Sequence, residues 1–278
     1  MPETQTMRAF ARRVKRFLNR HQAPLPGVIC TGDYASWAEA MANCTGYSAP
    51  VIVERTCASL LKVKNGEAVF ERDSVLLDTP EYSFPVLTGL LRVALINRGR
   101  LSVLDVGGSL GSSYFQFRKF LEPSTKLEWS VVEQPAHVSC GREHFESGEL
   151  HFFDTIEESI ARYRPNVLLL SGVLQCLEDP YGALDSFVTY RVPHVIIDRT
   201  AFLVADRDRL TVETVPDWIY PATYPSWFLS ETKVTDAMAA AGYSLVADFA
   251  GTDRLAPPDE AAYFKGFIYE LAAAPNPS

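Results

Sequence analysis

Short apolar stretches alternate with stretches of helical periodicity between residues 101 and 198, and this alternation is the clearest pattern along the chain. The apolar stretches predict strands at 101–106, 128–133, 150–153, 167–171 and 194–198. The stretches between them predict helices near 112–121, 136–146, 156–163 and 180–190. Strands and helices that alternate at this spacing form a parallel sheet with right-handed crossovers. Uniformly apolar strands such as 167–170 fit a sheet that is covered on both faces.

After Asp198 a long segment rich in aromatic residues and proline runs to Ser230. Beyond it the pattern predicts a helix at 231–241 and two strands at 243–250 and 264–271. Five parallel strands followed by a closing pair is the order of class I methyltransferases. We therefore predict an α/β fold of the class I methyltransferase (Rossmann-like) type over residues 100–272, with a mostly parallel seven-stranded sheet and a tail at 273–278.

The chain before residue 100 has a helical pattern instead. Stretches at 35–44, 50–62 and 84–97 predict helices, so we expect an N-terminal helical cap over residues 23–99. A separate basic helix is expected within residues 1–22. Its apolar side chains at 8–20 share one face, and the prolines and glycine of 24–27 end it.

Composition is that of an ordinary globular protein, since 47% of the 278 residues are hydrophobic and 22% are charged. Charge is uneven, however. Residues 1–20 hold six basic residues and one acid, whereas the rest of the chain carries 20 basic and 33 acidic residues. An acidic body argues against nucleic acid as the main partner.

The basic segment at 8–20 suggests weak contact with an anionic membrane surface or a partner; a solvated terminal helix is the alternative. No apolar stretch reaches the roughly 18 residues that span a bilayer, and the N-terminus lacks the apolar centre of a signal peptide. We expect a cytoplasmic protein that can contact the inner face of the membrane.

The five cysteines and five histidines are dispersed along the sequence. No pair has CxxC, HxH or HExxH spacing, so we expect reduced thiols and no metal site. His137 and His144, on the helix after the second strand, are expected at the surface.

The run LDVGGSLGS at 104–112 lies between the first strand and the first helix of the alternating region. Its glycines let the backbone turn tightly and approach a ligand closely. We expect it to hold the amino-acid part of S-adenosylmethionine, with Asp105 meeting the ammonium group through water. An ordinary turn is the plainer alternative, and the dinucleotide pattern GxGxxG is not matched. The loop residues assigned to the cofactor are Asp105, Gly107, Gly108, Ser109 and Gly111.

Three further residues at strand ends complete the expected cofactor site. Glu133 ends the second strand 22 residues after Gly111, where a carboxylate can accept hydrogen bonds from ribose hydroxyls. Asp154 follows the third strand and could accept from the adenine amine, or could cap the next helix. Ser171 follows the fourth strand, where the backbone would border the reacting groups. The alternative for Glu133 is a solvated acid.

Several stretches resemble a family of methyltransferase-type proteins found among bacterial surface-polysaccharide biosynthesis genes. They are LDVGGSLGSSYFQFRKFL, WSVVEQPAHV, LLLSGVLQCLEDP, VIIDRTAF, YPSWFLSE and FKGFIYE, with WAEA, GY and FERDS upstream. The resemblance covers roughly residues 35–270 and implies the fold and S-adenosylmethionine as cofactor. Cys176 departs from it, because relatives often have tyrosine there.

Candidate catalytic residues should lie at the carboxyl ends of the strands, where open α/β sheets bind ligands. Asp198 could accept a proton from a hydroxyl acceptor, and Arg199 could hold an acidic or phosphorylated one. Structural pairing of the two with their neighbours is the alternative. The aromatic segment 216–228 could wall an acceptor pocket suited to sugar rings, or could be a hydrophobic flap. Arg72 and Asp73 could contribute from the cap.

The leading hypothesis is an S-adenosylmethionine-dependent methyltransferase that acts on a sugar or other small intermediate of surface-polysaccharide biosynthesis. A non-catalytic scaffold protein that keeps the fold within a biosynthetic complex is the alternative. A nucleotide-dependent oxidoreductase is disfavoured because GxGxxG is broken. The acceptor atom and the oligomeric state stay open.

Overall fold

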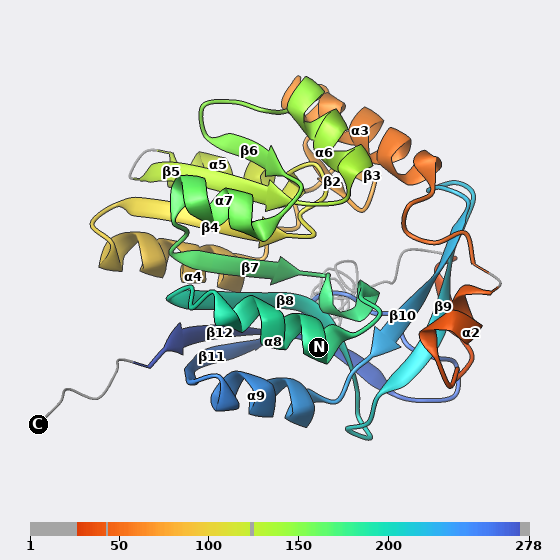
Figure 1. Ribbon diagram of the computed structural model, residues 1–278. Helices are drawn as coiled ribbons and strands as arrows, with labels where there is room; N and C mark the ends of the chain where they lie inside the picture. The colour runs from red at the N-terminus through yellow and green to blue at the C-terminus, as the bar shows by residue number, and fades with distance from the viewer. Residues whose placement is uncertain (1–26, 43, 123–124, 273–278) are drawn as a thin grey trace, which may run out of the picture.

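The computed structural model describes residues 27–42, 44–122 and 125–272, and its centre is a seven-stranded sheet (Figure 1). The strand order is β11-β12-β8-β7-β4-β5-β6. Strands β4 to β8 run parallel, and β12 is antiparallel to both its neighbours. This order confirms the predicted class I methyltransferase fold. The bounds are β4 (Arg100–Val106), β5 (Lys126–Val132), β6 (Leu150–Phe153), β7 (Val167–Ser171), β8 (His194–Leu203), β11 (Tyr243–Ala250) and β12 (Ala262–Leu271).

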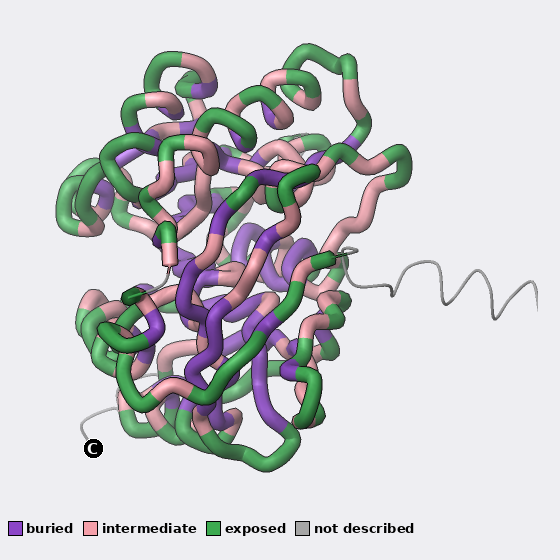
Figure 2. Tube along the Cα trace, turned by 90° about the vertical axis from the view of Figure 1, so that its right-hand side faces the viewer, coloured by how far each residue is buried: buried purple, intermediate pink, exposed green. Residues whose placement is uncertain are grey.

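Helices cover both faces of this sheet (Figure 1). Alternate side chains of one strand point to opposite faces, so Val103 belongs to one hydrophobic cluster and Leu104 to the other. The first cluster is covered by α4 (Phe84–Ile96), α5 (Ser112–Leu121) and α6 (Pro135–His144), and the second by α7 (Ile156–Tyr163), α8 (Pro180–Thr189) and α9 (Glu231–Ala240). Figure 2 shows the buried trace running through the interior, with exposed segments around it.

A second, three-stranded sheet lies beyond the carboxyl edge of the first. Strands β9 (Arg209–Val215) and β10 (Ala222–Phe228) form an antiparallel hairpin, and β1 (Ile29–Thr31) pairs with β9. The hairpin is inserted between β8 and α9, in the segment rich in aromatic residues and proline. The short helix α2 (Trp37–Met41) packs on its outer face through Ala40.

The segment at 23–99 differs from the expected helical cap. From residue 27 on, it contains β1 and the hairpin β2 (Phe70–Arg72) and β3 (Val75–Leu77) besides α3 (Pro50–Lys64). Strands of three residues are too short to show a clear alternation, and β1 exists only because β9 offers it an edge. Helix α4 also departs from a separate cap, because its buried face packs on the central sheet.

The expected basic helix at 8–20 and the tail at 273–278 lie outside the described residues. Among the helices that are described, none is long and apolar enough to cross a membrane.

Candidate functional site

The glycine loop turns the chain from β4 into α5 by left-handed backbone at Gly107, Ser109 and Gly111. Gly107 has a φ of +71°, and a Cβ added there would lie 2.5 Å from Cγ2 of Val173. Any side chain at Gly107 would therefore strain the backbone and push against the turn after β7. The sequence needs glycine here because two strand-end turns approach each other closely.

Asp105 lies beneath this loop and is almost fully buried. Its Oδ2 accepts a hydrogen bond from the Trp129 indole at 3.0 Å, whereas its Oδ1 has no partner. A Cβ on Gly108 would lie 2.5 Å from the carboxyl group, so the loop closes directly over it. Burial raises the pKa of Asp105 to about 7. The carboxyl group supports the loop from beneath, and its expected contact with a ligand ammonium through water stays a prediction.

Gly111 differs in role from Gly107. It is buried, and a Cβ added there would lie 3.1 Å from Cδ2 of Leu150 in the hydrophobic core. Its φ of +90° sets the N-cap of α5. Gly111 therefore faces the protein interior, and the expectation that it borders the ligand is corrected to a role in helix packing.

Glu133 and Asp154 lie at the same sheet edge, immediately after β5 and β6. Oε2 of Glu133 accepts a hydrogen bond from the backbone N–H of Gln134 at 2.5 Å. Asp154 is exposed and pairs with Arg142 at 3.1 Å. Thr155, not Asp154, caps α7 by accepting from the N–H of Glu158. The cap that was one alternative for Asp154 therefore belongs to its neighbour.

A cavity of about 440 Å³ opens at the carboxyl edge between the two sheets. Its floor includes Gly107 of the glycine loop, and Ser171 and Gly172 of the turn after β7. Much of the wall comes from the β2–β3 hairpin, the β9–β10 hairpin and the loop after β11. The expected cofactor loop and the inserted sheet thus line the same cavity.

The inserted sheet presents one face to this cavity. Residues two apart along a strand share a face, so Glu213 and Val215 of β9 and Tyr224, Ser226 and Phe228 of β10 all line it. The opposite face carries Leu210, Val212 and Trp227, which pack around Ala40 of α2.

Aromatic rings form one corner of the cavity. Tyr47 stacks on Tyr224 with ring centroids 4.1 Å apart and an angle of 24° between the planes. Tyr220 lies beside them, with its hydroxyl 3.4 Å from that of Tyr224. Of the aromatic residues expected to wall a pocket, Tyr220, Tyr224 and Phe228 do so. Trp227 faces α2 instead and donates to the carbonyl of Leu177, and Trp218 is 55% exposed.

Glu213 is the carboxylate of this wall. Burial and repulsion from Asp73 raise its pKa to about 7, against the hydrogen bond from Tyr224 that lowers it. A carboxyl group that titrates near neutral pH, in contact with a cavity, has the acidity that proton transfer requires. Sequence reasoning missed Glu213, and the available signal was the alternation of the RLTVETV stretch.

Arg199 enters the cavity because β8 bulges. Thr200 pairs with Lys265 and Ile197 with Phe267, so Asp198 and Arg199 together oppose the single residue Gly266. Arg199 has a φ of +52°. The bulge turns its guanidinium toward the cavity, where it pairs with Asp73 at 2.5 Å and with Asp253 at 3.2 Å.

Asp198 lies behind the cavity wall. Its strand continues to Leu203, because β12 keeps pairing with it, so Asp198 does not end the strand as expected. The residue is only 4% exposed, and Ser171 Oγ is 3.5 Å from its Oδ2. Burial raises its pKa to about 6 although Arg199 acts to lower it. Besides the aromatic residues, the residues predicted for the site that line the cavity are Gly107, Ser171, Arg199, Arg72 and Asp73.

Gln175 offers a second polar group to the cavity. Its Nε2 donates to the carbonyl of Arg199 at 3.0 Å, which fixes the orientation of the amide. Its Oε1 is buried and has no partner, so it can accept a hydrogen bond from a ligand.

One histidine expected at the surface is not there. His137 is 7% exposed, because the first turn of α6 packs it beside Glu133, whose Oε2 lies 4.0 Å from its Nδ1.

No family model matches the sequence, and no curated protein matches it. Among solved structures, the chain is similar to the N-terminal domain of EvdMO1 in the presence of SAH and D-fucose, at 11% identity and a TM-score of 0.47. The match covers 73% of this chain and 90% of the other. It is similar to magnesium protoporphyrin IX methyltransferase (ChlM) from Synechocystis PCC 6803 with bound SAH, at 13% identity and a TM-score of 0.45. That match covers 68% of this chain and 81% of the other. It is also similar to CalS10, an amino pentose methyltransferase from Micromonospora echinaspora, at 13% identity and a TM-score of 0.44. That match covers 69% of this chain and 92% of the other.

Proposed function

We propose that this protein is an S-adenosylmethionine-dependent methyltransferase that methylates a hydroxyl group of a sugar or sugar-derived intermediate. The observation that carries the proposal is the cavity, which brings Gly107 of the glycine loop together with Glu213 of the inserted sheet. A cofactor loop and a carboxyl group that titrates near neutral pH then face one chamber.

The residues at the carboxyl edge fit the cofactor. Gly107 and Gly172 place no side chains in the floor, and the orphaned Oε1 of Gln175 can accept a hydrogen bond there. Glu133 follows β5, where a carboxylate can bind ribose hydroxyls. Asp154 is exposed and pairs with Arg142 through one carboxylate oxygen, so its other oxygen can accept a hydrogen bond from the adenine amine. When bound, S-adenosylmethionine supplies a methyl group activated by its sulfonium.

The protein's own contribution is to align the acceptor and take its proton. We assign Glu213 as the group that accepts the acceptor's proton, because its carboxyl group lines the cavity. Asp198 lies behind the wall and positions Ser171 and the bulge of β8. Arg199 is held by two carboxylates, so it serves first to fix Asp73 in the wall and second to offset negative charge there. Glu213 then works beside rings that exclude water.

The acceptor class follows from the lining. Flat rings of Tyr47, Tyr220 and Tyr224 present apolar faces with polar rims, as a sugar ring needs. Carboxylates and arginines around them can hydrogen-bond several hydroxyl groups. The resemblance to proteins from surface-polysaccharide biosynthesis genes points to an intermediate of that process.

The test has two arms. Isothermal titration of the full chain with S-adenosylhomocysteine should show binding, and methyl-labelled S-adenosylmethionine with a panel of free sugars and sugar nucleotides should label at least one of them. Glu213→Gln should lose turnover and keep cofactor binding. Asp217→Asn, an exposed acid on the same hairpin and outside the cavity wall, should change neither.

Absence of both heat and thermal stabilisation with millimolar S-adenosylhomocysteine would remove the proposal. Binding without turnover on the whole panel would instead favour the scaffold alternative, in which the fold is kept and the chemistry is lost.

A further inference from the structure

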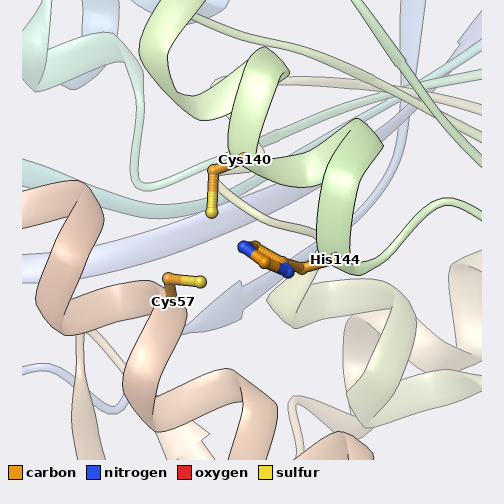
Figure 3. Close-up of side chains that lie close together, drawn as sticks. All are labelled: Cys57, Cys140 and His144. Atoms are coloured by element: carbon orange, nitrogen blue, oxygen red, sulfur yellow. The ribbon is translucent and has the colours of Figure 1, made fainter.

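Within the described residues, three metal-ligating side chains meet on the side of the molecule covered by α3 and α6. Cys57 comes from α3, and Cys140 and His144 come from α6 (Figure 3). One ligand atom of each, two thiol sulfurs and an imidazole nitrogen, lies within 4.8 Å of the others. None of the three lines the cavity described above.

The topology explains why the spacing along the chain does not reveal this group. Cys140 and His144 are four residues apart on one helix, so they share a face. Cys57 lies 83 residues before Cys140 and reaches them only because α3 packs beside α6. Figure 3 shows the three side chains turned toward one another between the two helices.

The donor set is soft. Two thiols and one imidazole match the ligands of zinc, which takes four ligands in a tetrahedron and often keeps one position for water. All three residues are partly exposed, so an ion can enter from solvent. The carboxylate of Glu143 lies 3.7 Å from Nε2 of His144 and adds negative charge beside the group.

The two thiol sulfurs of this group lie side by side, because every ligand atom of the three residues is within 4.8 Å of the others. A divalent cation is the partner that allows two adjacent thiolates to form, because its charge offsets their repulsion.

We propose that Cys57, Cys140 and His144 form a zinc site, with one coordination position left to water. The ion would join α3 to α6, and so would fasten the segment before the glycine loop to the helical layer of the central sheet. Lys64, two turns after Cys57, already donates to the carbonyl of His144, so the two helix ends are aligned without the ion. This site is independent of the proposed methyl transfer.

The first experiment uses the purified full chain after chelation and reduction. Zinc added to it should bind at one ion per chain, and Co²⁺ in its place should give thiolate-to-metal charge-transfer absorption. Cys57→Ser and Cys140→Ser should each lose that absorption, and His144→Gln should weaken binding. Cys44→Ser removes a partly buried thiol outside the group and should leave binding unchanged.

A second measurement needs no variant. Alkylation of the reduced wild-type chain, read by peptide mass spectrometry, should be slowed by zinc at Cys57 and Cys140 and unchanged at Cys44. Failure to bind zinc or Co²⁺ would overturn the proposal. So would alkylation rates at Cys57 and Cys140 that zinc leaves unchanged. A Cys57–Cys140 disulfide that persists in the protein before reduction and excludes the ion would overturn it as well.

Discussion

The Tyr224 hydroxyl donates a hydrogen bond to Oε1 of Glu213 at 3.3 Å, across a pair of residues that face each other in the β9–β10 ladder. Tyr224 is in turn stacked on Tyr47, which anchors its own hydroxyl on the carbonyl of Pro225. The carboxyl group is therefore held in place by a ring that is itself packed against Tyr47. A proton acceptor must be held in a fixed position to act on a bound substrate.

The raised pKa of Glu213 predicts how the rate of methyl transfer depends on pH. Its ionised form accepts the proton, and its pKa is raised to about 7, so kcat should rise with pH through a midpoint near 7 and then level. Glu213→Gln should lower kcat by roughly 10²–10⁴, the usual contribution of a general base. Steady-state rates from pH 5.5 to 9 measure both. A wild-type profile that is flat over this range would assign the proton to another group.

The two glycines that start and end the loop should respond differently to alanine. Gly107→Ala places a methyl group 2.5 Å from Cγ2 of Val173 at the cavity floor, so thermal stabilisation by S-adenosylhomocysteine should be lost. Gly111→Ala meets only Leu150 in the core, so it should lower the melting midpoint and leave binding to the remaining folded protein.

Gly148→Ala is the matched control, since nothing lies within 4 Å of a Cβ there. It should alter neither the melting midpoint nor the ligand shift by a measurable amount. Loss of ligand stabilisation in Gly111→Ala, with Gly107→Ala unaffected, would reverse the assignment of the two positions.

Much of the central sheet could be predicted because its strands carry their own pattern. Val167–Ser171 and Leu150–Phe153 are found as expected, since strands covered on both faces are mostly apolar. Strand β8 was predicted too short, because the residues after Asp198 pair with β12, whose contribution no local pattern contains.

The inserted sheet escaped prediction for a related reason. β1 has three residues and depends on an edge supplied by β9, almost two hundred residues later. Glu213 was hidden with it, because a single acid between valine and threonine is unremarkable until the opposite strand places a cavity on that face. The proposed cofactor end of the site carries a local signal, since glycine loops and strand-end acids recur at fixed spacing.

Arg199 should contribute to stability through its two carboxylates. Burial acts to raise the pKa of Asp253, yet the Arg199 guanidinium keeps it below its ordinary value. Arg199→Gln would leave that carboxylate, whose side chain is 19% exposed, without its partner. We expect a loss of about 1–3 kcal/mol in the free energy of unfolding, below the 3–5 kcal/mol of fully buried pairs because the Asp73 side chain is 44% exposed.

Urea denaturation measures this difference, and Arg207→Gln is its control. Arg207 also pairs with two carboxylates, but its side chain is 44% exposed, so its loss should cost no more than about 1 kcal/mol. Equal losses for the two variants would show that the Arg199 pairs contribute no more than a surface network.

Glu71 should make the folded state less stable as pH rises. The residue is 2% exposed, and burial raises its pKa to about 7 from an ordinary value of 4.5. Between these values the folded chain holds a proton that the unfolded chain has released. The free energy of unfolding therefore falls as pH rises from about 4.5 to 7, by about 3 kcal/mol from this group at most.

Glu71→Gln keeps the neutral shape that the fold prefers. Its oxygen can accept from the N–H of Ser74 as Oε1 does at 2.7 Å, and its amide can donate to the hydroxyl of Ser112, which lies 2.8 Å from Oε2. We expect the variant to match the wild type at pH 5 and to exceed it at pH 8, as measured by urea denaturation. Glu67→Gln, an exposed acid four residues earlier, should follow the wild type at both values. If Glu71→Gln is less stable than the wild type at pH 8, the ionised carboxylate is the form that binds Ser74 and Ser112, and hydrogen bonding outweighs burial at this position.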